Sequence, residues 1–243
     1  MRLTWPPRWV PALHLFFFLG DDGVHGTEIW RSDGTAAGTF QVADLRTGTE
    51  SSNPRWLTSF AGKLFFVADD GLSGKSLWTS DGTLAGTRLV KDVLPGSSHA
   101  GPSVLAPVGS RLLFFVLSAS RIDLWKSDGT TRGTVPVTGV VARSPPLAIE
   151  DASVVGRRLF FVAEVGKSGQ ELWTSDGTAA GTRALTRLSK AAAFVSPLHG
   201  GPLYLPTVSL GSRLVFPVDD GPHGQEMWVS DGTVAGTRPV LSS

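Results

Sequence analysis

The chain has 243 residues, no cysteine, and 22 basic against 21 acidic residues, which gives a net charge of +1. Balanced charge disfavours broad electrostatic capture of nucleic acid or an anionic membrane, and the absence of cysteine excludes disulfides, thiolate metal sites and cysteine nucleophiles. The 29 glycines, 16 prolines and 8 tryptophans, in a chain that is 41% hydrophobic, indicate many short strands joined by turns rather than a disordered linker.

The first twenty residues permit two interpretations. Arg2 and Arg8, followed by an apolar run at Leu15–Leu19, resemble the charged start and apolar core of a signal peptide. No small-residue cleavage site follows, and the run aligns with apolar runs that recur along the chain, so we favour a β-strand. No stretch approaches the roughly 18 consecutive apolar residues of a membrane-spanning helix, so we expect no membrane span.

A twelve-residue block, EIWRSDGTAAGT in its first copy, recurs five times. The copies are Glu28–Thr39, Ser76–Thr87, Asp123–Thr134, Glu171–Thr182 and Glu226–Thr237. Their tryptophans, numbered 30, 78, 125, 173 and 228, are 48, 47, 48 and 55 residues apart. A repeat of this length indicates a repeat architecture in which each unit buries its apolar surface against the next.

The second repeat predicts four antiparallel strands. They are expected at Pro54–Phe60, Lys63–Asp69, Lys75–Ser80 and Thr87–Leu94. Asp-Gly and Gly-x-x-Gly sequences between them supply the positive φ angles that hairpin turns require. The second strand is a continuous apolar run, which is typical of a strand buried on both faces. Four such strands per repeat fit the blade of a β-propeller.

Five repeats predict an all-β fold, a five-bladed β-propeller with four antiparallel strands per blade. We expect one domain over residues 1–243, with repeats at approximately 1–48, 49–97, 98–144, 145–193 and 194–243. Pro7–Val10 supplies a first strand for repeat 1, and Thr237–Leu241 a last strand for repeat 5, as ring closure would need. An open solenoid and a fragment of a longer array remain alternatives. About seven extra residues fall within Lys190–Gly211.

The blocks resemble the bacterial ELWxxDGT repeat family, which is also called hyalin-like. The resemblance is carried by Glu28-Ile29-Trp30 with Asp33-Gly34-Thr35, by the four equivalent blocks, and by the Asp-Asp-Gly-x-x-Gly sequence that precedes three of them. It covers essentially the whole chain. It implies an extracellular or cell-surface module with a binding or structural role, of the kind found in large secreted proteins of gliding and fruiting bacteria, and it implies no enzyme.

Two residue types of the block have a structural interpretation. The repeat tryptophan is expected to wedge between adjacent blades with its N–H bonded to a carbonyl, with a sugar-stacking platform as the alternative; Trp9 and Trp56 are also expected in the core. The aspartate of Ser-Asp-Gly-Thr is expected to bind backbone N–H groups across a tight turn. The structural residues are Trp30, Asp33, Trp78, Asp81, Trp125, Asp128, Trp173, Asp176, Trp228 and Asp231.

The loop between the second and third strand of each repeat is the candidate ligand-binding element. Strands alternate in direction, so these loops share one face of the ring with the connections between blades, while the Asp-Gly-Thr turns lie opposite. Polar residues that vary over a constant frame are typical of ligand-facing loops. The candidate residues are Asp22, His25, Glu28, Asp70, Glu171, Asp220, His223 and Glu226. A solvated hairpin held by a carboxylate–backbone bond is the alternative.

Cofactor and catalytic chemistry find little support in the sequence. No cofactor or metal is expected; Ca²⁺ remains an alternative because loop carboxylates and carbonyls are its ligands, although the spacing is not an EF-hand pattern. The five histidines lack metal-ligand spacing, and no nucleophile elbow or phosphate-binding loop is present. A paired-carboxylate glycosidase is the enzyme alternative.

The sequence predicts a non-catalytic, lectin-like module. We expect a monomer that binds glycans or surface polymers through loops on one face of the ring, where several weak sites would act together. The alternative is a structural or protein-interaction scaffold of a secreted or surface protein, with a protein partner and no small-molecule ligand.

Overall fold

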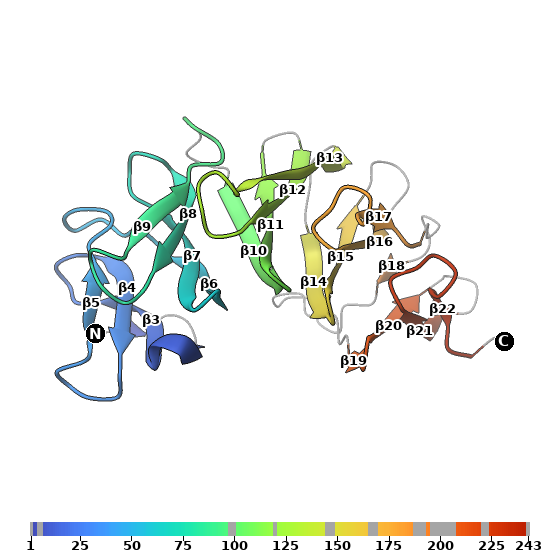
Figure 1. The fold of residues 1–243 in the computed structure, drawn as a ribbon, viewed down its shortest axis with the longest axis horizontal. Helices are drawn as coiled ribbons and strands as arrows, with labels where there is room; N and C mark the ends of the chain where they lie inside the picture. Colours follow the sequence, from blue (N-terminus) through green and yellow to red (C-terminus); the bar gives the residue numbers. More distant parts are fainter. Residues whose placement is uncertain are drawn as a thin grey trace. The chain divides into compact units, whose positions relative to one another are not determined.

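The computed structural model describes residues 2–3, 7–96, 101–118, 121–143, 149–164, 170–186, 193–194, 208–219 and 224–241. The chain divides into two compact units. The first comprises Met1–Ser118 and Trp125–Val135, and the second comprises Ala119–Leu124 and Pro136–Ser243. The expectation of a single domain with the repeat boundaries given above stays a prediction. Both units are built from antiparallel β-sheets (Figure 1).

Sheets 1 and 2 belong to the first unit. Sheet 1 contains β1 (Arg2–Leu3), β2 (Arg8–Val10), β3 (Leu15–Asp21), β4 (Thr27–Ser32) and β5 (Phe40–Ala43), with a 3₁₀ turn at Pro11–Leu13. Sheet 2 contains β6 (Arg55–Phe60), β7 (Lys63–Asp69), β8 (Lys75–Ser80) and β9 (Arg88–Lys91). Both β1 and β2 pair with β3, so the edge of sheet 1 next to β3 is formed by two short strands.

Sheets 3, 4 and 5 repeat the same strand order. Sheet 3 contains β10 (Gly101–Val108), β11 (Arg111–Leu117), β12 (Arg121–Ser127) and β13 (Val135–Arg143). Sheet 4 contains β14 (Ile149–Val155), β15 (Arg158–Glu164), β16 (Gln170–Ser175) and β17 (Arg183–Ala184). Sheet 5 contains β18 (Ala193–Phe194), β19 (Val208–Leu210), β20 (Arg213–Asp219), β21 (Gln225–Ser230) and β22 (Arg238–Pro239). The all-β expectation and the four-stranded repeat are confirmed. Most of the extra stretch within Lys190–Gly211 lies outside the described residues.

The strands of sheet 2 test the predicted boundaries. Strands β7 and β8 begin and end where the sequence predicts, while β9 is shorter than expected because it ends at Lys91. Asp92 follows, and its Oδ1 accepts a hydrogen bond from the N–H of Leu94 at 3.1 Å, which turns the chain away from the sheet. The hairpin turn between β6 and β7 uses left-handed φ angles at Ala61 and Gly62, 47° and 74°, as a tight hairpin requires.

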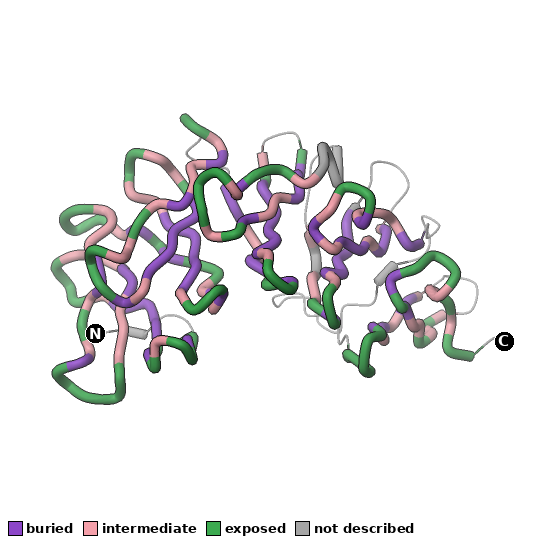
Figure 2. The backbone as a smooth tube through the Cα atoms, in the orientation of Figure 1, coloured by how far each residue is buried: buried purple, intermediate pink, exposed green. Residues whose placement is uncertain are grey.

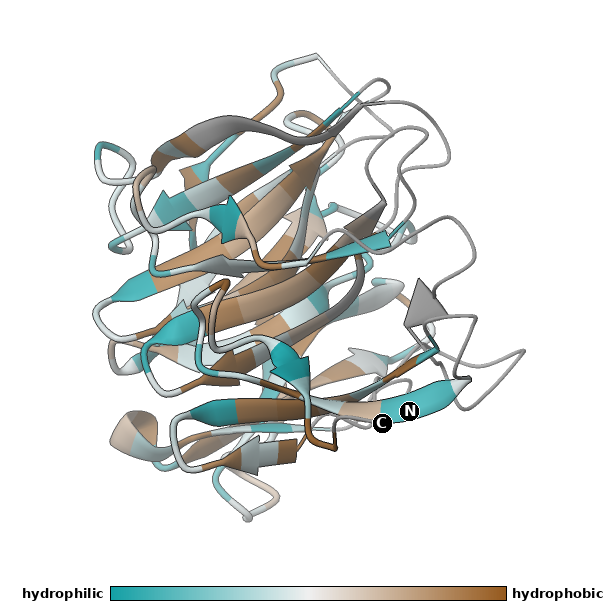
Figure 3. Cartoon of the chain, turned by 90° about the vertical axis from the view of Figure 1, so that its right-hand side faces the viewer, coloured by the Kyte–Doolittle hydropathy of each residue, from teal (hydrophilic) through white to brown (hydrophobic). Residues whose placement is uncertain are grey.

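The second strand of the repeat is buried on both faces. In β7, four consecutive residues from Leu64 to Val67 are at most 4% exposed, although their side chains point alternately to opposite faces of the sheet. Figure 2 shows burial concentrated in such strands and exposure in the turns, and Figure 3 shows the same division as apolar strand centres and hydrophilic strand ends. The prediction of doubly buried strands is therefore confirmed.

Apolar clusters fill the space between consecutive sheets within each unit. The cluster between sheets 1 and 2 joins Phe17 and Ile29 to Phe66 and Trp78. Equivalent clusters join sheets 2 and 3 and sheets 4 and 5. In each cluster, the face that carries the repeat tryptophan packs against the opposite face of the preceding sheet. We call these the Trp face and the opposite face of a sheet.

The repeat tryptophans pack without the hydrogen bond that the sequence predicted. Trp30 stacks on Phe18 across the strand pair at 6.4 Å between ring centroids, and its indole lies over Gly20, where an added Cβ would be 2.9 Å from Nε1. In all five repeats the indole nitrogen is buried and has no hydrogen-bond partner. The expected bond to a carbonyl is therefore wrong for these tryptophans. The ring of Trp30 instead stacks on Phe18 and lies over Gly20.

Trp9 and Trp56 are not core residues, in contrast to expectation. Their exposed fractions are 39% and 48%. The register of β6 against β7 shifts between Arg55 and Thr58, and Trp56 within this bulge has a left-handed φ of 58°. A bulge redirects the side chain that it contains, so Trp56 turns outward. Trp9 instead lies on the Trp face of sheet 1, in contact with Phe16 at 4.6 Å between centroids.

The Asp-Gly-Thr segment forms the same hydrogen-bonded turn in every repeat. In the second copy, Oδ1 of Asp81 accepts bonds from the N–H of Thr83 at 3.0 Å and from its hydroxyl at 2.7 Å. Thr83 Oγ1 then accepts the N–H of Gly86 at 2.9 Å. These bonds lower the pKa of the Asp81 carboxyl, and the pKa of the equivalent carboxyl is lowered by its threonine in the other four turns. Each turn is thus stabilised by its own side chains.

Candidate functional site

The loops of sheets 1 and 2 opposite the Asp-Gly-Thr turns lie together at one end of the sheets. The N–H of Thr27, at the start of β4, donates to Ser51 Oγ at 2.8 Å, and the N–H of Asp69, at the end of β7, donates to the carbonyl of Ser52 at 2.9 Å. Ser51 and Ser52 belong to the connection between β5 and β6. The connection between sheets therefore touches the β3–β4 and β7–β8 loops.

Asp22 and Asp70 hold their own loops in place. Asp22 Oδ1 accepts the N–H groups of Val24 at 2.8 Å and His25 at 2.9 Å, and its Oδ2 lies 2.8 Å from His25 Nδ1. These bonds lower the pKa of Asp22 well below its ordinary range, and the same contact raises the pKa of His25. Asp70 likewise accepts the N–H groups of Leu72 at 2.9 Å and Ser73 at 2.6 Å.

Glu28 lies beneath the surface. Its carboxylate, in a residue with no exposed surface, accepts the hydroxyl of Ser52 at 2.5 Å, the N–H of Ser52 at 2.8 Å and the N–H of Leu45 at 3.3 Å. Burial raises the pKa of this carboxyl, against the opposing effect of the bonds from Ser52. Glu28 therefore fastens the connection between sheets 1 and 2, and a ligand would have to displace that connection to reach it.

The remaining candidates are divided between two environments. Glu171 is 7% exposed and is buried like Glu28, whereas Glu226 is only half-buried at the start of β21. Asp220 and His223 lie outside the described residues. The structure therefore brings Asp22 and His25 together, buries Glu28 and Glu171, and leaves Asp70 inside its own loop.

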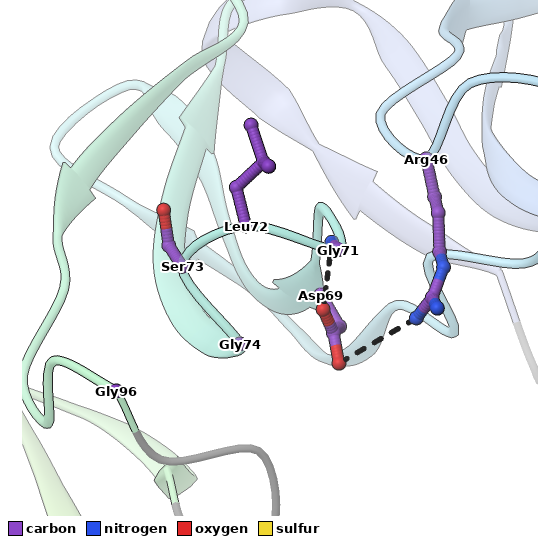
Figure 4. A pocket seen from close by; sticks show the side chains of 7 residues that line it. All are labelled: Arg46, Asp69, Gly71, Leu72, Ser73, Gly74 and Gly96. Atoms are coloured by element: carbon purple, nitrogen blue, oxygen red, sulfur yellow. Dashed lines mark hydrogen bonds and ion pairs between the residues drawn. The ribbon is translucent and has the colours of Figure 1, made fainter.

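A polar cavity of about 250 Å³ opens between three loops of the first unit (Figure 4). One loop joins β5 to β6, one joins β7 to β8, and one joins β9 to β10. The lining residues are Arg46, Asp69, Gly71, Leu72, Ser73, Gly74 and Gly96. The cavity thus lies among the loops that the sequence assigned to the ligand-facing side.

The charged groups of the cavity are fixed by one another. Arg46 pairs with Glu50 at 2.6 Å and lies 3.8 Å from Asp69, whose other oxygen accepts the N–H of Gly71 at 2.8 Å. The Ser73 hydroxyl donates to Asp70 at 3.1 Å. Two carboxylates, those of Glu50 and Asp69, face the guanidinium of Arg46. Among the lining residues only Arg46 and Asp69 are charged, so the wall is balanced in charge. Three polar side chains, those of Arg46, Asp69 and Ser73, line the cavity.

Sequence reasoning did not single out Arg46, Ser73 or the adjacent Asp69 as ligand-facing residues. Asp69 was visible as the first aspartate of the Asp-Asp-Gly sequence, but only its neighbour Asp70 was selected. Arg46 lies in an irregular connection that differs between repeats, so no repeat signal marks it. Its proximity to Asp69 depends on the fold, because the two residues come from connections of different sheets.

Among the described residues, no three His, Asp or Glu side chains gather into a set that could hold a metal ion. The described part of the chain contains no helix with the length and apolarity needed to cross a bilayer.

Comparisons with known proteins identify the fold. No family model matches the chain, and no curated protein matches it. Solved structures do: a prolyl endopeptidase (TM-score 0.61, 13% identity, 98% of this chain and 36% of that one), oligopeptidase B from Leishmania major (0.58, 14%, 100% and 33%) and a puromycin hydrolase S511A mutant complexed with PGG (0.53, 16%, 94% and 36%).

These likenesses concern the fold alone, because identity is low and the chain spans about a third of the length of the solved proteins it matches. Together with the five antiparallel sheets, they establish an all-β, five-bladed β-propeller fold with four antiparallel strands per blade. The short additional strands at the edges of sheets 1 and 5 leave the four-stranded repeat intact.

Proposed function

We propose that the chain is a non-catalytic, lectin-like module that binds glycans or surface polymers through the loops opposite the Asp-Gly-Thr turns. The cavity among Arg46, Asp69 and Ser73 is the observation that carries this proposal. A guanidinium, a carboxylate and a hydroxyl offer both donors and acceptors to the hydroxyl groups of a sugar. The family resemblance of the repeats supports an extracellular or cell-surface location.

The size and lining of the cavity favour a small neutral group. Its volume of about 250 Å³ lies below the roughly 300–1,000 Å³ of pockets that enclose drug-sized ligands. Glycines at three lining positions leave backbone groups accessible, and Leu72, which is 93% exposed, provides an apolar edge beside the polar wall. The lining carries one guanidinium and one carboxylate, and this balanced charge favours a neutral sugar ring over a uronic acid or a sulfated sugar.

Weak single sites suit a repetitive polymer. The equivalent loops differ in charge from repeat to repeat, and each connection between sheets has its own sequence. Several weak contacts along one polymer raise the overall avidity without a deep pocket. The absence of a catalytic role is supported by the carboxylates of Asp22, Asp70 and Glu28, which are committed to hydrogen bonds that hold loops.

Calorimetry with neutral and acidic oligosaccharides tests the proposal. Arg46→Met removes the guanidinium at nearly constant length and should reduce affinity for a neutral oligosaccharide at least tenfold. Arg88→Met, on the exposed edge strand β9, is the matched control and should bind as the wild type does. Equal affinity of the two variants would remove the cavity from the binding site, and silence of the wild type across diverse sugars would overturn the lectin-like function.

A structural or protein-interaction scaffold is the second candidate. The observation that favours it is the use of Asp22, Glu28 and Asp70 as internal fasteners, which leaves fewer free carboxylates on the loop face than the sequence suggested. This function predicts that Arg46→Met leaves a cell-surface pull-down intact while no sugar binds. Binding of a defined oligosaccharide that depends on Arg46 would exclude it as the sole function.

A further inference from the structure

Arg46 reaches the cavity from a segment that no strand holds. Strand β5 ends at Ala43, so the backbone of Arg46 belongs to the connection between β5 and β6. Its guanidinium nevertheless has a defined place, 2.6 Å from Glu50 and 3.8 Å from Asp69. The side chain also runs past Gly71, where an added Cβ would lie 3.6 Å from Nε (Figure 4). The position of the guanidinium therefore depends on whatever fixes this connection.

The carboxylate of Glu28, on β4, closes the part of the connection that carries Arg46. It accepts the N–H of Leu45 at 3.3 Å, and it accepts both the N–H and the hydroxyl of Ser52. The backbone N–H of Arg46 acts on the same group, because it lowers the pKa of the Glu28 carboxyl. Both ends of the segment 45–52 are thus joined to one buried side chain, and Arg46 lies next to one of these ends.

Other repeats show that the strand itself does not require this glutamate. Strand β8 pairs with β7 in the register in which β4 pairs with β3, and Ser76 stands in the place of Glu28. Ser76 has no exposed surface and donates to the carbonyl of Ser73 at 3.2 Å, within its own loop. Repeat 3 has Asp123 and repeat 4 has Glu171 at the same position, and both are buried. A serine therefore fits this place in the strand, so the role of the glutamate lies in what it holds.

The connection that follows sheet 2 lacks the guanidinium as well as the glutamate. The registers of β5 and β9 make Leu94 the equivalent of Arg46. Sheet 2, with Ser76 in place of the glutamate, is therefore followed by an apolar residue where sheet 1 is followed by an arginine. Arg46 and the buried carboxylate that holds its backbone thus occur together beside the cavity.

We propose that Glu28 is a positioning residue of the sugar site, which holds the segment 45–52 so that the Arg46 guanidinium stands beside Asp69 at the cavity. This inference rests on the proposed function and names a residue that determines affinity without touching the ligand. Glu28 has no exposed surface, so its effect on binding passes through the connection. A long side chain loses conformational freedom when it binds, and a backbone that is already fixed reduces this cost.

Calorimetry with a neutral oligosaccharide tests the inference with residues that the repeats themselves supply. Glu28→Ser introduces the residue of repeat 2 and should weaken binding about tenfold, a coupling in the range found for residues of one hydrogen-bond network. Glu28→Asp introduces the residue of repeat 3, retains a carboxylate and should restore part of the affinity. Glu171→Ser makes the same change at the buried glutamate of repeat 4, and this matched control should bind as the wild type does.

A double-variant cycle shows whether the effect passes through Arg46. In the Arg46→Met background, Glu28→Ser should cause no further loss of affinity, because the group that Glu28 positions is gone. Losses that simply add would overturn the inference, since additivity indicates independent sites. Amide hydrogen exchange at Arg46 and Ser52 should be faster in Glu28→Ser than in the wild type, and unchanged exchange would contradict the clamp.

The outcomes separate the positioning role from the proposed function. A wild type that binds no sugar, or binding that is indifferent to Arg46→Met, overturns the sugar site and this inference with it. Binding that depends on Arg46 but is unchanged in Glu28→Ser overturns the positioning role alone. Urea denaturation of each variant completes the comparison, because a purely structural Glu28 would lower stability in Glu28→Ser and leave the affinity as it is. An equal loss of affinity in Glu171→Ser would also overturn the inference.

Discussion

The carboxylate of Asp81 occupies the place that a Cβ atom on Gly86 would need. The same relationship joins Asp33 to Gly38 and recurs in the other three repeats. The turn therefore requires its second glycine for space, because the aspartate must approach the backbone to accept the bonds from Thr83. The first glycine of the turn, Gly82, is required for a different reason, because its φ of 89° is strained for any residue with a side chain.

Replacement of Gly86 by alanine should destabilise the protein. The added methyl group would collide with Asp81, and relieving an overpacked contact of this kind costs about 1–3 kcal/mol. Urea denaturation of Gly86→Ala measures the change, with Leu84→Ala in the same turn as the exposed control. The double variant Asp81→Ala/Gly86→Ala should lose less stability than the sum of the losses in the two single variants, because the added methyl group has no carboxylate to collide with. Strict additivity would contradict this account.

The five turn aspartates should make stability depend on acid pH. Their pKa values are lower in the folded chain than the ordinary 3.8. Their contribution to the free energy of unfolding is therefore complete above the unfolded pKa and is lost as the pH falls through the folded pKa. Denaturation curves between neutral pH and strong acid should show this loss. Asp81→Asn should be less stable than the wild type at neutral pH, and its free energy of unfolding should fall less steeply as the pH decreases. An unchanged slope would argue against the turn as the source of the pH dependence.

The contact between His25 and Asp22 should appear in a proton titration. Asp22 raises the pKa of His25 above 6.5 by accepting its ring hydrogen bond. An NMR titration of the imidazole should give a pKa above that value in the wild type and a lower one in Asp22→Asn. The contact contributes stability below pH 6.5 that is lost as the pH rises through the folded pKa. A His25 titration that does not change in Asp22→Asn would refute the contact.

Removal of Trp125 should cost much more stability than removal of Trp56. Trp125 packs against the cluster between sheets 2 and 3 and lies 6.3 Å from Phe114 between ring centroids, so Trp125→Ala should cost about 3–5 kcal/mol. Trp56 is 48% exposed, and Trp56→Ala should cost less than about 1 kcal/mol. Thermal or urea denaturation compares the two. Similar costs would mean that the repeat tryptophan is not the wedge that the packing indicates.

The strands and turns followed from the sequence because their chemistry is local. The bonds from Ser80 to Thr87 and from Asp81 to Thr83 span at most seven residues, so five copies of one block specify five copies of one turn. Continuous apolar runs such as Leu64–Val67 indicated burial on both sides before any contact was known. The same repetition predicted β7 and β8 to the residue and the propeller fold with them.

Tertiary structure decided which side chains remain free for function. The carboxylate of Glu28 accepts a hydrogen bond from Ser52, which is 24 residues away along the chain. Arg46 pairs with Asp69 only because the connections of two sheets come together. Trp56 is exposed because a bulge turns it outward. A repeated sequence assigns equivalent residues the same local structure, but only the packing around each copy determines whether a carboxylate or an aromatic ring is buried, paired or available.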